Sequence, residues 1–324
     1  MFRASYLARK GAQLALTLFA VITFNFLLFR VLPGDPIRLI ARAGHLSADE
    51  MEQLRATFGL DRPLVVQYGY YLRSLFHGDF GFSITYRRPV ADILAERMVN
   101  TAILLGAATV LIVFLGVGVG VIAAARRGSK LDSSSVVTAL LFWSLPTFWM
   151  GMLLVFLLGV WLHAFPISGI TTPGAVYTSM LDRWSDIVSH IVLPTVTLAL
   201  VDIGQFVLIT RSSLIDVLTE DFILTAKAKG LSRRSVIWKH GVRNALLPVI
   251  TASALYISLV VGGAIQVETV FSWPGMGRLV YDAVLRRDYP ILESCFLIFA
   301  VAVILANLAS DLMYQVLDPR VREA

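Results

Sequence analysis

Two polar side chains in an apolar stretch are the first candidates for chemistry in this sequence. Asp202 and Gln205 interrupt the hydrophobic run over residues 191–209, and residues three apart share one face of a helix. A carboxylate at the middle of a membrane-spanning helix costs about 2.5–3.5 kcal/mol to insert, so it normally faces a bundle interior or a wet cavity. The pair predicts a polar lining of a path through the membrane. An interhelical hydrogen bond, or a shallower depth for Asp202, stays an equal alternative.

The sequence contains no recognisable motif for bond-making chemistry. The strings G-x-S-x-G and H-E-x-x-H are absent, and no paired Cys/His ligand set occurs. An intramembrane enzyme, the alternative class, would need an acid or nucleophile dyad, and Asp202 has no evident carboxylate partner at comparable depth. The single cysteine, Cys295, excludes an internal disulfide. We therefore predict that the chain is not an enzyme, with no catalytic residue and no metal site.

A glycine-rich stretch within an apolar run resembles a phosphate-binding loop only superficially. A phosphate loop needs a preceding strand and a following helix N-terminus, and no G-x-x-x-x-G-K-[ST] string occurs. Gly116, Gly118 and Gly120 instead favour close packing of helices, because small residues let two backbones approach. The chain therefore has no recognisable nucleotide site of its own.

The longest strongly charged segment separates two apolar runs and spans residues 220–248. Thr219 or Asp221 is expected to cap a helix through Ala228, which a break at Gly230 separates from a second short helix. The segment carries six basic residues against two acidic ones: Lys227, Lys229, Arg233, Arg234, Lys239 and Arg243 against Glu220 and Asp221.

This segment also has an apolar face, which consists of Phe222, Ile223, Ala226 and Trp238. Such a face can enter a groove on a partner protein, as amphipathic helices commonly do. A basic amphipathic element can also lie on anionic lipid. The residues alone favour the two interpretations equally.

The composition assigns the chain to a membrane class. Of its 324 residues 57% are hydrophobic and 15% charged, and the mean hydropathy is +0.74. Soluble domains average about 45–50% apolar and about 25% charged residues. The net charge of +6 does not indicate nucleic acid as a partner, because most basic residues flank apolar runs and do not form a basic surface with exposed aromatics.

Six apolar runs are long enough to cross a membrane, which takes about 20 residues. We expect them at residues 11–32, 101–125, 136–162, 191–209, 247–267 and 291–312. The first is too long for the apolar core of a cleaved signal peptide, about 7–15 residues, and Pro146 is expected to kink the third. The predicted fold class is an all-α integral membrane protein with six transmembrane helices.

Charge predicts the sidedness of these spans. The excess of Lys and Arg falls in the N-terminal tail, residues 126–130, residues 211–243 and the C-terminal tail. Basic residues accumulate on the cytoplasmic side of membrane proteins, so both termini are expected in the cytoplasm. His190, Gln266 and Glu268, near span ends, are expected at the membrane interface rather than on a path.

The spans divide the chain into three parts. Residues 1–32 hold the N-terminal tail and first span, residues 33–100 an extracytoplasmic segment with short helices, and residues 101–324 a core of five spans containing the cytoplasmic loop 212–247. In the middle part, Ser47 to Glu50 form a capping box, and Pro63 starts a helix that ends near Gly78. A structural cap over the spans is expected there more than a separate ligand-binding role.

Short strings along the whole chain resemble the dipeptide, oligopeptide and nickel permeases of ABC importers, specifically the first of their two permease subunits. The 212–247 loop resembles the EAA loop of this family at Thr225, Ala226, Gly230, Leu247 and Pro248, with Leu224 in place of the glutamate. The other strings are Leu32-Pro33-Gly34-Asp35-Pro36, Gly59-Leu60-Asp61-Arg62-Pro63, Gly78-Asp79-Phe80-Gly81, Phe271-Ser272-Trp273-Pro274-Gly275, Arg287-Asp288-Tyr289-Pro290 and Asp318-Pro319-Arg320.

The resemblance implies a type I ABC importer permease in the bacterial cytoplasmic (inner) membrane. Its partners would be a second homologous permease subunit, two cytoplasmic ATP-binding subunits, an extracytoplasmic solute-binding protein and membrane lipid. ATP and Mg²⁺ would bind to the ATPase subunits, and this chain would hold no cofactor. The expected function is import of di- or oligopeptides by alternating access, with nickel or another small solute as the alternative.

The resemblance also shifts the preferred role of the 212–247 loop toward docking on an ATPase subunit. The residues expected to couple the two subunits are Glu220, Asp221, Thr225, Ala226, Ala228, Gly230 and Leu231. Asp202 and Gln205 remain the candidates for the path.

Overall fold

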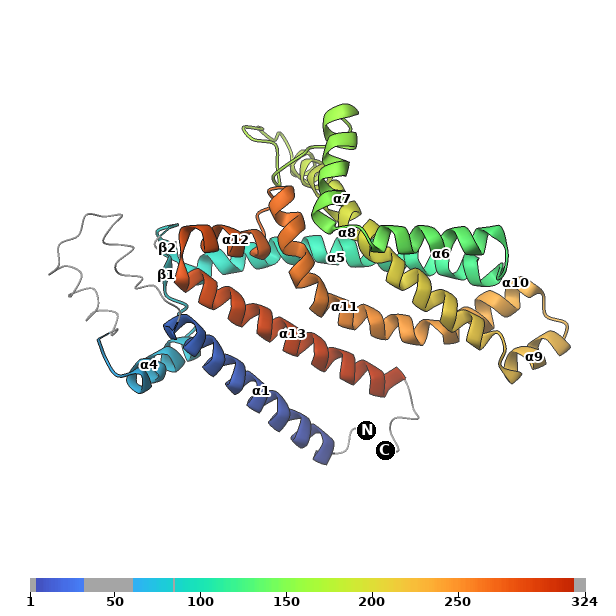
Figure 1. The fold of residues 1–324 in the computed structure, drawn as a ribbon, viewed down its shortest axis with the longest axis horizontal. Helices are drawn as coiled ribbons and strands as arrows, with labels where there is room; N and C mark the ends of the chain where they lie inside the picture. The colour runs from blue at the N-terminus through green and yellow to red at the C-terminus, as the bar shows by residue number, and fades with distance from the viewer. Residues whose placement is uncertain (1–3, 32–60, 84, 318–324) are drawn as a thin grey trace. The chain divides into compact units, whose positions relative to one another are not determined.

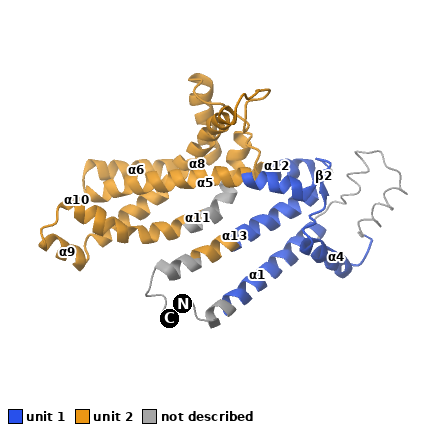
Figure 2. Cartoon of the chain, turned by 180° about the vertical axis from the view of Figure 1, so that it is seen from behind, with its two compact units in different colours: residues 1–99, 279–304 blue, residues 100–278, 305–324 orange. Residues whose placement is uncertain are grey.

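The computed structural model describes residues 4–31, 61–83 and 85–317 (Figure 1). The chain forms two compact units, coloured separately in Figure 2. Unit 1 consists of residues 1–99 and 279–304, and unit 2 of residues 100–278 and 305–324. The capping box predicted at Ser47 to Glu50 lies outside the described residues.

Helices account for nearly all the described secondary structure, and the two short strands β1 (Phe82–Ser83) and β2 (Arg88–Pro89) pair antiparallel. Several helices predicted from sequence extend further than the apolar runs that predict them. The helices are α1 (Ala4–Val31), α4 (Leu64–Phe76), α5 (Val90–Ala125), α6 (Lys130–Trp143), α7 (Thr147–Leu154), the π-helix η1 (Val155–Trp161), α8 (Met180–Val217), α9 (Asp221–Ala228), α10 (Arg233–Ser235), the π-helix η2 (Val236–Val242), α11 (Arg243–Val270), α12 (Met276–Arg286) and α13 (Tyr289–Leu317).

In unit 1, α4 packs beside α1 through aromatic rings. The Phe26 ring lies 5.1 Å from the Tyr68 ring and 5.4 Å from the Tyr71 ring, centroid to centroid. Asn25 Nδ2 donates hydrogen bonds to Tyr71 Oη at 3.2 Å and to the Glu293 carbonyl of α13 at 2.9 Å. Burial raises the pKa of Tyr71 to about 12. The helix predicted to start at Pro63 is confirmed, because Pro63 is the N-cap of α4.

A second contact in unit 1 joins the β1–β2 hairpin to the start of α13. Ser83 Oγ and the Thr85 backbone N both donate to Asp288 Oδ2, at 2.7 and 3.1 Å. The Tyr86 backbone N donates to Ser83 Oγ at 3.0 Å, and burial raises the pKa of the Tyr86 hydroxyl. Two sequence strings about 200 residues apart therefore form one buried joint.

The span predicted at residues 136–162 is broken in unit 2. Helix α6 ends at Trp143, α7 begins at Thr147, and the pair is bent by 100°. Pro146 is the N-cap of α7, where its missing N–H costs no helical hydrogen bond. The predicted kink is therefore a complete break, which can be one bent span or a re-entrant pair.

The number of spans is smaller in the described residues than the six predicted. Four described helices are long and apolar enough to cross a membrane, or five if the bent pair α6 and α7–η1 counts as one span. Helix α8 extends well beyond the run predicted at residues 191–209. The segment between the spans predicted at residues 247–267 and 291–312 contains α12.

Close contact between α5 and α8 forms much of the core of unit 2. A Cβ atom built on Gly116 would lie 2.5 Å from Phe206 Cβ, and one on Gly120 would lie 2.6 Å from Thr210 Cβ. Real Cβ atoms do not approach so closely, so both positions require glycine. The packing interpretation of the glycines is confirmed for these two, whereas a Cβ on Gly118 would meet nothing within 4 Å.

Candidate functional site

The 212–247 loop contains two helical pieces separated at Gly230. Helix α9 ends at Ala228, and α10 and η2 follow without interruption from Arg233 to Val242. Gly230 has φ +75°, a left-handed conformation that only glycine adopts at little cost. The predicted break at Gly230 and the second short helix are confirmed.

The capping predicted for α9 is wrong. Its N-cap is Glu220, and no side chain caps it. The Thr219 hydroxyl donates to the Asp216 carbonyl at 2.6 Å, one turn back in α8, so it is directed away from α9. Ser232 accepts from the Ser235 backbone N and caps α10, so the second helix starts where a serine follows the break.

The apolar face of α9 is used within the chain. Ile223, Ala226 and Val236 form a buried cluster with Leu218 packed against it. The expectation that Ile223 and Ala226 enter a groove on a partner is therefore wrong for this structure, because they join α9 to η2. Four large apolar side chains of α9, η2 and the turn between them are exposed instead: Phe222, Leu224 (56%), Leu231 and Trp238 (54%).

The residues predicted to couple this loop to a partner divide into two groups. Ala226 is buried, and its methyl group belongs to the cluster just described. The other residues are exposed on α9 and the turn after it: Glu220, Asp221, Thr225, Ala228, Gly230 and Leu231. The structure brings them together on one short segment, and their coupling role stays a prediction.

The 212–247 loop contacts the rest of unit 2 where α5 ends. We call this region the Ala125 end. Arg233 Nη2 donates to the Ala125 carbonyl at 2.6 Å, so a cation lies at the C-terminus of α5, where the helix dipole favours it. Ser213 Oγ of α8 donates to the Ala245 carbonyl of α11 at 3.0 Å. Leu214 and Ala245 are buried in one cluster with Val121 and Ala124 of α5.

An ion pair that sequence reasoning missed lies at the same end. Arg211 Nε donates to Asp132 Oδ1 at 2.5 Å, and Arg211 Nη2 donates to Asp132 Oδ2 at 2.9 Å. Asp132 is 3% exposed, and Oδ2 also accepts from the Gly128 backbone N at 2.9 Å. The sequence offers only a local signal, because the Ser129 N-cap three residues earlier fixes Asp132 in the first turn of α6.

The opposite end of unit 2, which we call the Asn100 end, is organised around Glu268. This residue, expected at a membrane interface, is fully buried. Thr101 Oγ1 donates to Glu268 Oε1 at 2.6 Å, and the Arg278 backbone N donates to Oε2 at 3.0 Å. The carboxylate thus lies at the N-terminus of α12, where a negative charge is stabilised.

Trp273 completes the Asn100 end. Its side chain is 0% exposed, and its Nε1 donates to the Asn100 carbonyl at 3.1 Å, while Asn100 Nδ2 donates to the Pro274 carbonyl at 2.8 Å. A Cβ on Gly277 would lie 2.6 Å from Ile265 Cα. Tight backbone contact and the hydrogen bonds of Trp273 and Asn100 therefore hold this end together with the Glu268 carboxylate.

The two path candidates lie half-buried on α8, between these ends. Tyr256 Oη of α11 donates to Asp202 Oδ2 at 2.6 Å, and the Tyr256 ring packs edge-on against Phe206 with centroids 5.5 Å apart. One of the two alternatives, an interhelical hydrogen bond, is therefore present. The path role of Asp202 and Gln205 stays a prediction.

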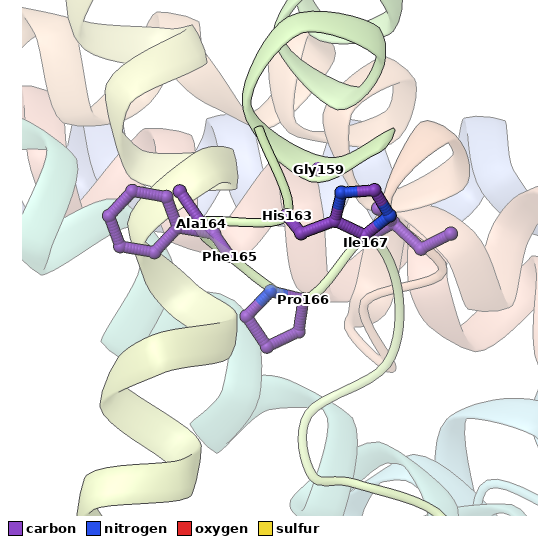
Figure 3. A pocket seen from close by; sticks show the side chains of 6 residues that line it. All are labelled: Gly159, His163, Ala164, Phe165, Pro166 and Ile167. Atoms are coloured by element: carbon purple, nitrogen blue, oxygen red, sulfur yellow. The ribbon is translucent and has the colours of Figure 1, made fainter. Parts of the chain in front are cut away.

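A hollow of about 420 Å³ lies where η1 meets the following loop (Figure 3). His163 provides the only polar side chain among its six lining residues: Gly159, His163, Ala164, Phe165, Pro166 and Ile167. One imidazole without a second polar group forms no catalytic arrangement. Within the described residues, no group of three or more His, Cys, Asp or Glu side chains could hold a metal ion.

Long apolar helices, a polar loop with its own small core and two buried acidic anchors define a multi-pass helical membrane protein. Residues 116–323 match the family described as binding-protein-dependent transport system inner membrane component. Residues 1–105 match the family that describes the N-terminal part of such membrane components. The chain belongs to this family of transport permeases.

Relatives with assigned names extend over nearly the whole chain. The chain is 37% identical over 333 residues to the dipeptide transport system permease protein DppB of Escherichia coli (strain K12), covering 98% of each protein. It is 40% identical over 318 residues to the glutathione transport system permease protein GsiC of the same strain, covering 98% of this chain and 99% of that one. The oligopeptide transport system permease protein AppB of Bacillus subtilis (strain 168) is 37% identical over 319 residues, with the same coverage.

A solved structure has a similar fold. The inward-facing MetNI methionine ABC transporter matches with a TM-score of 0.56 at 17% identity, covering 70% of this chain and 96% of that chain. At this identity the likeness shows the fold alone.

Proposed function

We propose that this chain is a permease subunit of an ATP-driven importer of di- or oligopeptides. The relatives named for dipeptide, oligopeptide and glutathione transport support this substrate class, because each covers nearly the full chain. Glutathione is itself a small peptide, so the three names describe one chemical class. Nickel is the second candidate from sequence, and no described residue cluster favours it.

The proposed topology has six spans with both termini in the cytoplasm of a bacterial cell, in its cytoplasmic (inner) membrane. The positive-inside rule supports it, because the basic loop and both basic tails then lie on one side. The Ala125 end of unit 2 would face the cytoplasm and the Asn100 end the exterior. The bent pair α6 and α7–η1 would form one of the six spans.

The 212–247 loop is proposed as the docking element for a cytoplasmic ATP-binding subunit. The observation that carries this assignment is the exposed set Phe222, Leu224, Leu231 and Trp238 on a segment that has its own buried cluster. A preformed apolar surface can enter a groove without paying a large ordering cost on binding. The alternative, attachment to anionic lipid, would use the basic side chains together with the same apolar groups.

The proposed mechanism is alternating access in a complex of two permease subunits, two ATP-binding subunits and an extracytoplasmic solute-binding protein. ATP and Mg²⁺ would bind to the ATP-binding subunits. Closure of those subunits would move the 212–247 loop, and this movement would reach α8 and α11, to which the loop is directly connected. This chain would provide the path for the solute and would transmit the movement of the loop to α8 and α11. It would carry out no bond-making chemistry.

The test of the proposed function is uptake by the complete complex in liposomes with the cognate binding protein. Radiolabelled dialanine, trialanine and glutathione are compared with radioactive Ni²⁺, with and without ATP inside the liposomes. We expect ATP-dependent uptake of at least one peptide and none of the metal. Uptake of Ni²⁺ alone would refute the peptide assignment, and peptide uptake without ATP would refute the ATP-driven importer.

A further inference from the structure

The inference concerns the ion pair between the buried Asp132 and the half-buried Arg211 in unit 2. Both oxygens of Asp132 accept from the guanidinium, at 2.5 and 2.9 Å, and this two-point geometry fixes direction as well as distance. The Gly128 backbone N holds Oδ2 from the other side at 2.9 Å. The carboxylate therefore has one orientation, set by the first turn of α6.

The pair connects the last turns of α8, which continues into the 212–247 loop, with the first turn of α6. Arg211 lies in the last two turns of α8, which ends at Val217 shortly before α9 begins at Asp221. Leu214, in the same turns, packs in the buried cluster that includes Val242 of η2. Any displacement of the 212–247 loop therefore acts on the part of α8 that carries Arg211.

Asp132, the other residue of the pair, lies on α6, which is not part of the 212–247 loop. Asp132 lies in the first turn of α6, and α6 ends at the 100° bend that precedes α7. Further along, α6 and α8 meet at Gly204, where a Cβ would lie 2.5 Å from the Ala139 carbonyl oxygen. That contact brings the two helices close at one point, between a glycine and a backbone carbonyl, and it contains no side-chain hydrogen bond. The ion pair is directional and fixes the axial register of α6 on α8.

We infer that Asp132 and Arg211 are positioning residues that transmit movement of the 212–247 loop through α8 to α6 and, across the bend, to α7. The inference rests on the proposed function, because it assumes that an ATP-binding subunit moves the loop. Neither residue touches the transported solute. Their loss should disconnect ATP hydrolysis from transport, and assembly should persist.

The experiment measures ATP hydrolysed per dialanine imported in liposomes that hold the complete complex and its binding protein. Asp132→Asn keeps the shape of the side chain and removes its charge. We expect the ratio to rise by about fivefold or more, the usual lower range for a coupling between sites. The double variant Asp132→Arg with Arg211→Asp restores an opposite-charge pair, and its ratio should return to within about twofold of wild type.

The matched control is Arg88→Gln, which removes an exposed ion pair with Glu96 at 3.7 Å and should leave the ratio unchanged. If Asp132→Asn prevents assembly, Arg211→Lys keeps the charge without the two-point fork and should give an intermediate rise. If the single variant that assembles shows an unchanged ratio of ATP hydrolysed to dialanine imported, because hydrolysis and uptake fall together, the inference is overturned. The proposed function would then still stand. Absence of ATP-dependent dialanine uptake in the wild type, with uptake of no other peptide, would instead overturn the proposed function and the inference with it.

Discussion

The two ends of unit 2 are both held by a buried acidic side chain, yet they are built differently. At the Asn100 end, Glu268 accepts from a hydroxyl and a backbone N–H, next to the fully buried Trp273. At the Ala125 end, Asp132 accepts from a guanidinium, and the adjoining loop exposes Trp238. Tight apolar packing has one low-energy arrangement, whereas the loop beside the ion pair exposes large side chains, so less packing opposes its movement. The difference indicates a fixed end and a movable end.

The prediction with the largest expected effect concerns Trp273, the buried aromatic side chain of the fixed end. Trp273→Ala deletes a fully buried indole, and such truncations typically cost about 3–5 kcal/mol of stability. We expect a lower melting temperature of the purified complex, measured by thermal unfolding in detergent, and reduced yield. Trp273→Phe, which keeps one aromatic ring and loses the hydrogen bond to the Asn100 carbonyl, should lose less stability. Equal stability of Trp273→Ala and wild type would mean that this end is not rigidly packed.

The same substitution at the movable end should affect association rather than folding. Trp238 is 54% exposed, so Trp238→Ala should change the melting temperature of this chain little. If Trp238 enters a groove on the ATP-binding subunit, its loss should weaken that association by about 2 kcal/mol or more, as for aromatic hot spots. Co-purification of the two subunits at increasing dilution measures the effect. Unchanged association, with lost binding to anionic liposomes, would favour the lipid alternative.

A smaller effect is expected at the turn that joins the two helices of the loop. Gly230 has φ +75°, and a residue with a Cβ in this region costs about 1–2 kcal/mol. A Cβ there would meet nothing within 4 Å, so Gly230→Ala tests backbone conformation without a clash. We expect a modest fall in both uptake and co-purification. Gly118→Ala, inside α5 and also without a neighbouring atom within 4 Å, is the control and should change neither.

The sequence predicted the features that depend on neighbouring residues. Gly230, Pro146 and Pro63 act through their own backbone, so the break, the bend and the start of α4 could be read from local order. The side-chain pairs at the two ends of unit 2 could not be predicted in this way, because Asp132 and Arg211 are 79 residues apart and Thr101 and Glu268 are 167 apart. Local spacing likewise placed Ile223 and Ala226 on an apolar face without indicating that η2 would cover it.

The hydrogen bond between Tyr256 and Asp202 lies between the two ends and provides the smallest test. Tyr256→Phe removes only the hydroxyl that donates to Asp202 Oδ2 at 2.6 Å, and interhelical hydrogen bonds in membranes average about 0.6 kcal/mol. Stability should therefore change little. If Asp202 lines the path, freeing its carboxylate should alter the relative uptake of neutral and cationic dipeptides, measured as competition between dialanine and dilysine. If the bond only joins α8 to α11, the ratio of the two uptakes should equal that of wild type, and Asp202→Asn should likewise leave peptide preference unchanged.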